Sequence, residues 1–234
     1  MALDHRRVLA LIPAHNEGPR IGDVVRAAAR HLPVLVVDDG SGDDTALNAE
    51  AAGATVLSQN PNQGKGAALR AGFGWALADL ADAVVTLDGD GQHDPDELPS
   101  FITAYRAGSV EGRTPELIIG RRDFSAMPAS RRLANALGTA VLSLALGRSI
   151  PDNQSGYRLI GRRLMTSTLE STEPGFEFEV EMIAICLREG WDVEWVPIRT
   201  IYGSGGSHIR PLRHLRDFIR ITLRARRIVR ARTR

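Results

Sequence analysis

The feature that most constrains the fold is an alternation of short apolar runs with helical patterns over the first 120 residues. The apolar runs, each long enough for a buried strand, are 8–12, 34–37, 55–57, 84–87 and 117–119. Apolar residues at helical spacing occupy 21–31, 45–52 and 67–80, and a further helix is expected after Pro95. Strands that alternate with helices in this way predict an α/β fold, with a mostly parallel sheet flanked by helices.

The second half of the chain is less regular. An almost entirely apolar helix is expected at 133–146, followed by a loop at 149–156, a short strand, a helix around 178–189 and a strand at 193–196. The apolar helix is too short to span a bilayer, so we expect it to be buried or interfacial. We divide the chain into a main domain at 1–206 and a basic C-terminal segment at 207–234.

Cysteine usage and the length of the apolar runs indicate a cytoplasmic location. Cys186 is the only cysteine among 234 residues, which excludes an intrachain disulfide bond and fits a reducing compartment. The apolar run near the start ends at Pro13, so it is too short for a signal peptide. No apolar run approaches the ~20 residues of a membrane-spanning helix.

The net charge of +1 conceals an uneven distribution. Residues 207–234 carry ten arginines and one aspartate, a net charge of +9, so the remainder carries −8. From Leu212 onward the apolar residues share one helical face, and the adjoining side carries Arg213, Arg216, Arg220, Arg224 and Arg227. A basic amphipathic helix of this kind lies in the headgroup plane, so we expect peripheral membrane contact through 210–230. The alternative is that its apolar stripe packs on the body of the protein or on a second subunit.

Polar clusters directly follow three of the predicted strands, at 13–17, 38–44 and 88–95. Ligands of such sheets bind beyond the carboxyl ends of the strands. Acids gathered at one sheet edge repel each other and need a cation or a hydrogen-bonding ligand. Asp88, Asp90 and Gln92 offer hard oxygen ligands that suit Mg²⁺ or Mn²⁺. We therefore predict a metal site at Asp88, Asp90 and Gln92.

Lys65 is the only lysine of the chain, and it stands in the sequence NQGKG at the start of a predicted helix. The glycines permit close backbone approach, and a helix N-terminus beside a lysine favours an anion such as a phosphate. The sequence is not a Walker loop, and no GxGxxG follows the first strand, which argues against a dinucleotide dehydrogenase. The alternative for Lys65 is a solvated helix start.

Several stretches between Val8 and Tyr202 occur in an order known from one family. They are LIPAHNE, VVDDGSGDDT, NQGKGAALRAG, TLDGDGQHDP, GRR, MPASRRLAN, DNQSGYRLI, FEFEVEMI and WVPIRTIYG. Together they resemble glycosyltransferase family 2, and within it the dolichol-phosphate mannose synthases and their bacterial polyprenyl-phosphate relatives. The resemblance implies the GT-A (Rossmann-like) fold, in agreement with the alternation of strands and helices.

The resemblance also implies roles for individual residues. Those expected to hold the nucleotide sugar are Pro13, Ala14, Glu17, Asp39, Lys65 and Asp88. Those expected at the acceptor phosphate are Arg122, Arg131, Asn135, Ser155, His208 and Arg210, with Arg121 as an alternative to Arg122. The residues expected to carry catalysis are Asp88, Asp90, Arg131 and Asp152. Ser155 belongs to a D-x-x-S-G element with Gly156, and Glu181 matches a recurrent glutamate of unspecified role.

The function implied is the inverting, metal-dependent transfer of a hexose, such as mannose or glucose, to a polyprenyl (dolichyl-type) phosphate. The donor is a GDP- or UDP-linked sugar, the cofactor is Mg²⁺ or Mn²⁺, and the location is peripheral, on the cytoplasmic face of the membrane. The alternative within the family is a hydroxyl acceptor, for which Asp152 is the candidate general base. A non-enzymatic alternative is a membrane- or nucleic-acid-binding module led by the basic tail. We expect no nucleic-acid partner, because the strand-end acids repel it.

Overall fold

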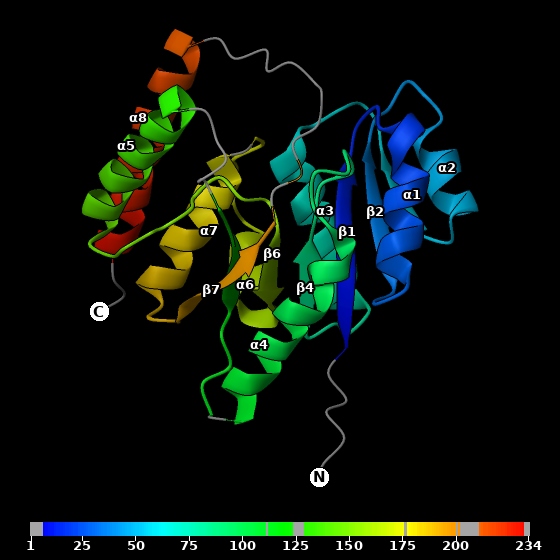
Figure 1. The fold of residues 1–234 in the computed structure, drawn as a ribbon, viewed down its shortest axis with the longest axis horizontal. Coiled ribbons are helices and arrows are strands. Elements are labelled where there is room, and N and C mark those ends of the chain that lie inside the picture. Colours follow the sequence, from blue (N-terminus) through cyan, green and yellow to red (C-terminus); the bar gives the residue numbers. More distant parts are fainter. Residues whose placement is uncertain are drawn as a thin grey trace.

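The computed structural model describes residues 7–110, 112–123, 129–175, 177–199, 201 and 211–231. The described residues form a seven-stranded sheet in the order β3-β2-β1-β4-β6-β5-β7 (Figure 1). The strands are β1 (Val8–Ala14), β2 (Val34–Asp39), β3 (Thr55–Gln59), β4 (Ala83–Thr86), β5 (Leu117–Arg122), β6 (Arg158–Gly161) and β7 (Val193–Ile198). Strand β6 is antiparallel to β4 and β5, and the other pairings are parallel. The predicted mostly parallel α/β sheet is confirmed.

Helices cover both faces of the sheet. They are α1 (Gly18–Ala29), α2 (Thr45–Ala51), α3 (Lys65–Ala78), α4 (Leu98–Val110), α5 (Ala129–Leu146), α6 (Arg162–Thr168), α7 (Glu177–Arg188) and α8 (Pro211–Arg230), with a 3-10 turn η1 (Pro95–Glu97). One core lies under α1, α2 and α4, and the other lies under α3, α5, α6, α7 and α8. The sequence patterns missed the short α6 and the antiparallel direction of β6.

Strand β1 shows why these apolar runs become central strands. Its side chains alternate between the two cores, with Leu9 and Leu11 in one and Val8, Ala10 and Ile12 in the other. A strand that is covered on both faces needs a continuous apolar run rather than an apolar–polar alternation. Since β1 pairs with β2 on one side and β4 on the other, the carboxyl ends of these three strands meet at one edge of the sheet.

Helix α8 packs against the body of the protein. It contacts α7 and α5, and Figure 1 shows α5 and α8 side by side at one end of the molecule. Ile221 and Ala225 of α8 belong to the core under α3, α5, α6 and α7, and their side chains are 4% and 0% exposed. The prediction of a separate segment beginning at residue 207 stays a prediction. Within the described residues, no helix is both long and apolar enough to cross a membrane.

Two arginines expected on the membrane-facing side of α8 are instead paired with acids of the body. Arg224 lies 2.7 Å from Glu173 and 3.0 Å from Glu181. Arg220 lies 3.4 Å from Glu173 and from Glu177. A membrane contact of these two arginines stays a prediction. Their side of α8 lies beside acids of α7 and of the residues before it, because Glu173 and Glu181 are buried carboxylates that need counter-ions.

Replacing Ile221 with alanine tests the docking of α8. We expect Ile221→Ala to lower the free energy of unfolding by about 2–5 kcal/mol, because it leaves a cavity under the helix. The matched variant Ile219→Ala, at a residue that is 50% exposed, should cost about 0.5 kcal/mol or less. Urea unfolding followed by circular dichroism measures both. Equal and small effects would contradict the packing of α8 on the core.

Candidate active site

The loops after β1 and β2 are fastened to each other by hydrogen bonds. The backbone N–H of Asn16 donates to Ser41 Oγ at 2.9 Å, and the N–H of Gly42 donates to Asn16 Oδ1 at 2.8 Å. The N–H of Glu17 donates to Thr45 Oγ1 at 2.9 Å. The first two strand-end motifs therefore form one wall.

An open pocket of about 340 Å³ lies where these loops meet the loop after β4. Its lining includes all six residues predicted to hold the nucleotide sugar, together with Asp90, and comprises Pro13, Ala14, His15, Glu17, Asp39, Asn62, Gly64, Lys65, Ala68, Asp88, Gly89 and Asp90. Gln92 is not part of the lining. Its side chain is exposed, and its backbone N–H donates to Asp90 Oδ1 at 2.9 Å. The structure thus brings the predicted donor residues together without Gln92.

Lys65 is held between two carboxylates at the floor of this pocket. Its Nζ lies 2.6 Å from Asp88 Oδ1 and 2.9 Å from Glu179 Oε1. Burial by itself would lower the pKa of Lys65, but the charges of Glu179 and Asp88 outweigh burial, and the net pKa is raised. Lys65 is therefore a permanent ammonium, and the alternative of a solvated helix start is wrong for its side chain.

The carboxylate of Asp88 is kept ionised by the same pair. Burial by itself would raise the pKa of Asp88. The nearby positive charges, chiefly the ammonium of Lys65, lower this pKa by more than burial raises it, so the net pKa lies below the usual value. Behind it, the backbone N–H of Asp88 donates to His93 Nδ1 at 3.0 Å. Burial lowers the pKa of His93, which fits an imidazole that accepts this hydrogen bond.

Asp39 positions the loop that leads into α3. Its carboxylate accepts the N–H groups of Gln63 and Gly64, at 2.8 and 2.7 Å, and its carbonyl accepts a hydrogen bond from Asn62 Nδ2 at 3.0 Å. The side chain is buried and lines the pocket at the same time. Asp39 therefore fixes the loop that ends where α3 begins, at Lys65.

Protein backbone lies at the N-terminus of α3, where the sequence predicts a phosphate, and that phosphate stays a prediction. The N–H of Gly66 donates to the carbonyl of Pro174 at 2.7 Å. A Cβ at Gly66 would lie 2.6 Å from the carbonyl oxygen of Glu173 and 2.8 Å from that of Gly175. The glycine therefore admits the backbone of residues 173–175.

The D-x-x-S-G element lies against the Lys65–Asp88 ion pair. A Cβ at Gly156 would lie 2.8 Å from Lys65 Nζ and 3.1 Å from Asp88 Oδ2, so a side chain there would displace the ammonium. The preceding Ser155 is buried, and its Oγ has no hydrogen-bond partner among the described residues.

Arg158, which is fully buried, holds this element in place. It donates to the carbonyl oxygens of Ser155 at 2.7 Å, Asn153 at 3.2 Å and Glu179 at 2.5 Å. One side chain thus fixes the loop before β6 and the first turn of α7.

Asp152 and Arg122 form a bidentate ion pair. Arg122 Nε donates to Asp152 Oδ2 at 2.8 Å, and Nη2 donates to Oδ1 at 2.9 Å. The N–H of Gln154 also donates to Oδ1, at 3.0 Å, and Asp152 is buried. A carboxylate engaged on both oxygens by a guanidinium is a poor general base.

The remaining predicted acceptor residues lie on α5 or outside the described part. Asn135 is half-buried on α5, and its carbonyl accepts a hydrogen bond from Thr139 at 2.6 Å. Arg131 is a residue of α5 whose side chain is not among those described, and His208 and Arg210 lie outside the described residues. Their predicted roles stay predictions.

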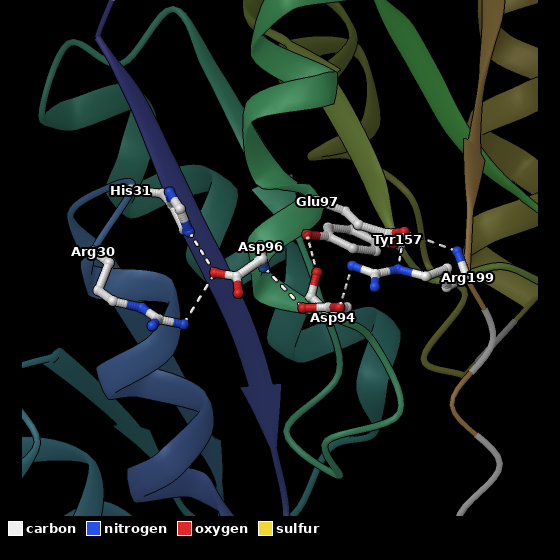
Figure 2. A network of polar contacts seen from close by, with 7 residues as sticks. All are labelled: Arg30, His31, Asp94, Asp96, Glu97, Tyr157 and Arg199. Atoms are coloured by element: carbon white, nitrogen blue, oxygen red, sulfur yellow. Dashed lines mark hydrogen bonds and ion pairs between the residues drawn. The ribbon is translucent and has the colours of Figure 1, made fainter.

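A polar network holds the loop after β4 from behind (Figure 2). Tyr157, at the start of β6, donates to the carbonyl of Asp94 at 3.0 Å, and burial raises the pKa of its hydroxyl. Arg199 pairs with Asp94 at 2.7 Å and with Glu97 at 3.3 Å. On the other side Asp96 accepts from Arg30 and His31, at 3.0 and 2.9 Å. The network joins the end of α1, the turn η1 and the residues after β7.

Glu179 is the site residue that the sequence patterns missed. It lies in the stretch FEFEVEMI, where only Glu181 was singled out. Glu181 instead accepts from Ser171 at 2.6 Å and pairs with Arg224. The single lysine was the one signal in the sequence for a further acid at the site, because an ammonium buried beside Asp88 is stabilised by additional counter-charges.

The donor set at the pocket fits a divalent cation that shares its coordination with a ligand. Asp88 and Asp90 present carboxylate oxygens to the pocket, and such hard ligands suit Mg²⁺ or Mn²⁺. Among the residues that the structure describes, no three His, Cys, Asp or Glu side chains are grouped closely enough to hold a metal alone. Mg²⁺ commonly uses one or two carboxylates and completes its shell with substrate phosphates and water.

The fold and the acidic pocket agree with the family to which the sequence is matched. The model of "Glycosyl transferase family 2" matches residues 10–167, so the chain belongs to this family and is a glycosyltransferase.

Two curated relatives illustrate the relationship. Undecaprenyl-phosphate mannosyltransferase of Micrococcus luteus is 33% identical over 207 residues, covering 82% of both chains. Polyprenol monophosphomannose synthase of Mycolicibacterium smegmatis is 32% identical over 211 residues, covering 82% of this chain and 77% of its own.

A solved structure confirms the GT-A fold. Glucosyl-3-phosphoglycerate synthase of Mycobacterium tuberculosis, in complex with Mn²⁺, UDP and glucosyl-3-phosphoglycerate, superposes with a TM-score of 0.68 at 25% identity. The match covers 95% of this chain and 80% of that chain.

Substituting Gly156 tests the contact between Lys65 and Asp88. We expect Gly156→Ala to push Lys65 away from Asp88. A misplacement of about 1 Å in an active site can lower the rate about 10²-fold, so sugar transfer should fall by about that factor. Gly74→Ala on α3 is the control, since a Cβ there meets nothing within 4 Å. Steady-state rates at matched helical content measure the effect. Wild-type rates for Gly156→Ala would show that the Lys65–Asp88 contact is dispensable.

Proposed function

We propose that this glycosyltransferase moves a hexose from a nucleoside-diphosphate sugar to a polyprenyl phosphate in a reaction that depends on Mg²⁺ or Mn²⁺. A phosphate oxygen of the lipid forms a bond to the anomeric carbon while the bond from that carbon to the diphosphate breaks. The nucleoside diphosphate leaves with the electron pair, and the anomeric configuration inverts. The names of the M. luteus and M. smegmatis relatives support the acceptor class.

The observation that carries this proposal is the engagement of the carboxylates around the pocket. Most acids around the pocket pair with a cation or with backbone N–H groups: Glu17 with Arg20, Asp39 with Gln63 and Gly64, Asp88 and Glu179 with Lys65, and Asp152 with Arg122. Asp90 is the further acid of the pocket, and we assign it to the divalent cation. A hydroxyl acceptor needs a free general base. A lipid phosphate is anionic at neutral pH and needs none. The site therefore favours the phosphate.

The donor end of the pocket combines acids with a single ammonium. Asp39, Asp88 and Asp90 would repel a diphosphate, and Lys65 offsets only one of these charges. A divalent cation on Asp88 and Asp90 would supply the missing positive charge to the leaving group. Lys65 would hold the diphosphate beside Asp88. The M. tuberculosis enzyme is solved in complex with Mn²⁺ and UDP, which supports the use of a divalent cation with a nucleoside diphosphate.

Removing one carboxylate tests the metal dependence. We expect Asp90→Asn to keep the fold and to lower transfer by at least about 10²-fold, because the charge on the diphosphate loses its stabilisation. Radiolabelled GDP-mannose and UDP-glucose, with undecaprenyl phosphate as acceptor, give the rate with and without EDTA. Unchanged transfer by this variant in the presence of EDTA would refute the metal role.

The choice of acceptor is tested by omitting the phosphate. We expect the wild-type protein to glycosylate undecaprenyl phosphate and to leave undecaprenol untouched under identical conditions, because the acids described around the pocket are paired or, at Asp90, assigned to the cation. Product analysis by mass spectrometry distinguishes the two. Transfer to undecaprenol at a comparable rate would favour the hydroxyl acceptor instead.

We also propose that the outer face of α5 and α8 contacts the cytoplasmic face of an anionic membrane. The two helices meet near Gly138, where a Cβ would lie 3.9 Å from Phe218. The exposed apolar side chains at helical spacing are Leu137, Val141 and Leu144 on α5 and Ile219 and Leu223 on α8. Exposed arginines accompany them, at 132, 148, 226, 227 and 230. Apolar side chains among arginines suit a shallow position among anionic headgroups.

Charge placed on this face should prevent the contact. We expect Leu144→Asp and Leu223→Asp to reduce sedimentation with phosphatidylglycerol vesicles at least about tenfold, because each puts a carboxylate where an apolar side chain would enter the interface. Leu47→Asp on α2, at a residue that is 64% exposed, is the matched control. Equal pelleting of all three variants would place the membrane contact elsewhere.

A further inference from the structure

The two carboxylates that share Lys65 differ in their surroundings. Asp88 is 32% exposed and lines the pocket, next to Gly89 in the loop after β4. Glu179 is 6% exposed, is absent from the lining of the pocket, and lies in the first turn of α7. Only Asp88 can therefore meet a ligand in the pocket, whereas Glu179 meets Lys65 from the protein interior.

The position of Glu179 is fixed by its neighbours. Arg158 donates to its carbonyl at 2.5 Å, and the adjacent Phe178 packs so closely on α3 that a Cβ at Gly66 would lie 2.9 Å from it. Gly156 lies so close to the ammonium of Lys65 that a Cβ there would be 2.8 Å from Nζ. The ammonium is therefore confined, and it has one fixed and one exposed counter-ion.

We propose that Glu179 is a positioning residue that retains the Lys65 ammonium when a divalent cation replaces it as the partner of Asp88. In the metal-free protein Lys65 neutralises Asp88. As the cation takes Asp88, Lys65 stays beside Glu179 and keeps its positive charge at the pocket for the diphosphate. The inference rests on the proposed function, because it takes Asp88 as a metal ligand.

Removing the charge of Glu179 leaves Asp88 as the remaining carboxylate of the two that lie within 3 Å of Lys65. A cation would then have to displace an ammonium that has lost its buried counter-ion. We expect Glu179→Gln to weaken Mg²⁺ binding by about 10- to 100-fold, the usual range for a residue behind a metal ligand. Glu179→Asp should restore part of the affinity. The matched control is Glu181→Gln, the same change on the same helix at a buried glutamate that pairs with Arg224, and it should leave Mg²⁺ affinity unchanged.

Because Lys65 is the only lysine of the chain, its side chain can be observed by itself. Protein labelled with ¹³C,¹⁵N-lysine should give a single ε-methylene signal, followed by NMR during titration with Mg²⁺, alone and with UDP or GDP. We expect a saturable shift in the wild type and in Glu181→Gln, and the same shift only at higher Mg²⁺ in Glu179→Gln. A wild-type signal that stays unchanged while Mg²⁺ and nucleotide bind would overturn the proposal.

A double-mutant cycle separates retention of Lys65 from a simple charge effect. Calorimetric Mg²⁺ affinities are compared for Glu179→Gln in the wild-type and Lys65→Met backgrounds. We expect the effect of Glu179→Gln to disappear when Lys65 is methionine. An undiminished effect would show that Glu179 acts through its charge alone, and would overturn the proposal. If Lys65→Met does not fold, the titration of the lysine signal decides.

The outcomes also distinguish this inference from the proposed function. Normal binding of Mg²⁺ and nucleotide with an invariant lysine signal contradicts only the role of Glu179. Absence of any Mg²⁺-dependent nucleotide binding in the wild type contradicts the proposed function and with it the inference.

Discussion

The structure of the site depends on one buried ammonium. Lys65 connects the start of α3, the end of β4 and the first turn of α7 through two contacts below 3 Å. An ammonium held away from water is tolerated only with counter-charges close by. Close to these contacts, a Cβ at Gly156 would lie 2.8 Å from Lys65 Nζ, and the backbone of residues 173–175 lies against α3. The surroundings of a single side chain thus determine the composition of loops far apart in the sequence.

Most of the fold could be predicted from the sequence, because buried parallel strands are continuous apolar runs. All five strands expected in the first 120 residues are present, within one to three residues at their ends. The short β6 and α6 were harder to place. Arg158, at the start of β6, is a charged residue inside the core, and only its three carbonyl partners explain why it is buried there.

The residues of the site at the ends of strands could be predicted. Those whose roles depend on contacts between distant segments could not. Asp39, Lys65 and Asp88 line one pocket as expected, since adjacent parallel strands bring their carboxyl ends together. The roles of Gly66 and Glu179 depend on how residues 173–175 and the start of α7 approach α3. The single lysine indicates that a buried acid is needed, but it does not indicate which acid reaches it. The ion pairs of Arg220 and Arg224 could not be predicted either, because their acids lie more than thirty residues earlier in the chain.

The reversed direction of β6 has a consequence for how such a protein can diversify. In a purely parallel sheet, every loop at the pocket edge leads out of a strand, so it is inherited together with that strand and the helix after it. Because β6 enters from this edge, the segment before it, with Asp152 and Gly156, arrives from α5 instead. The half of the molecule from β5 onward could therefore vary α5 and this segment during evolution, with Gly156 kept beside Lys65, while the strands that lead to Asp39 and Asp88 stay unaltered.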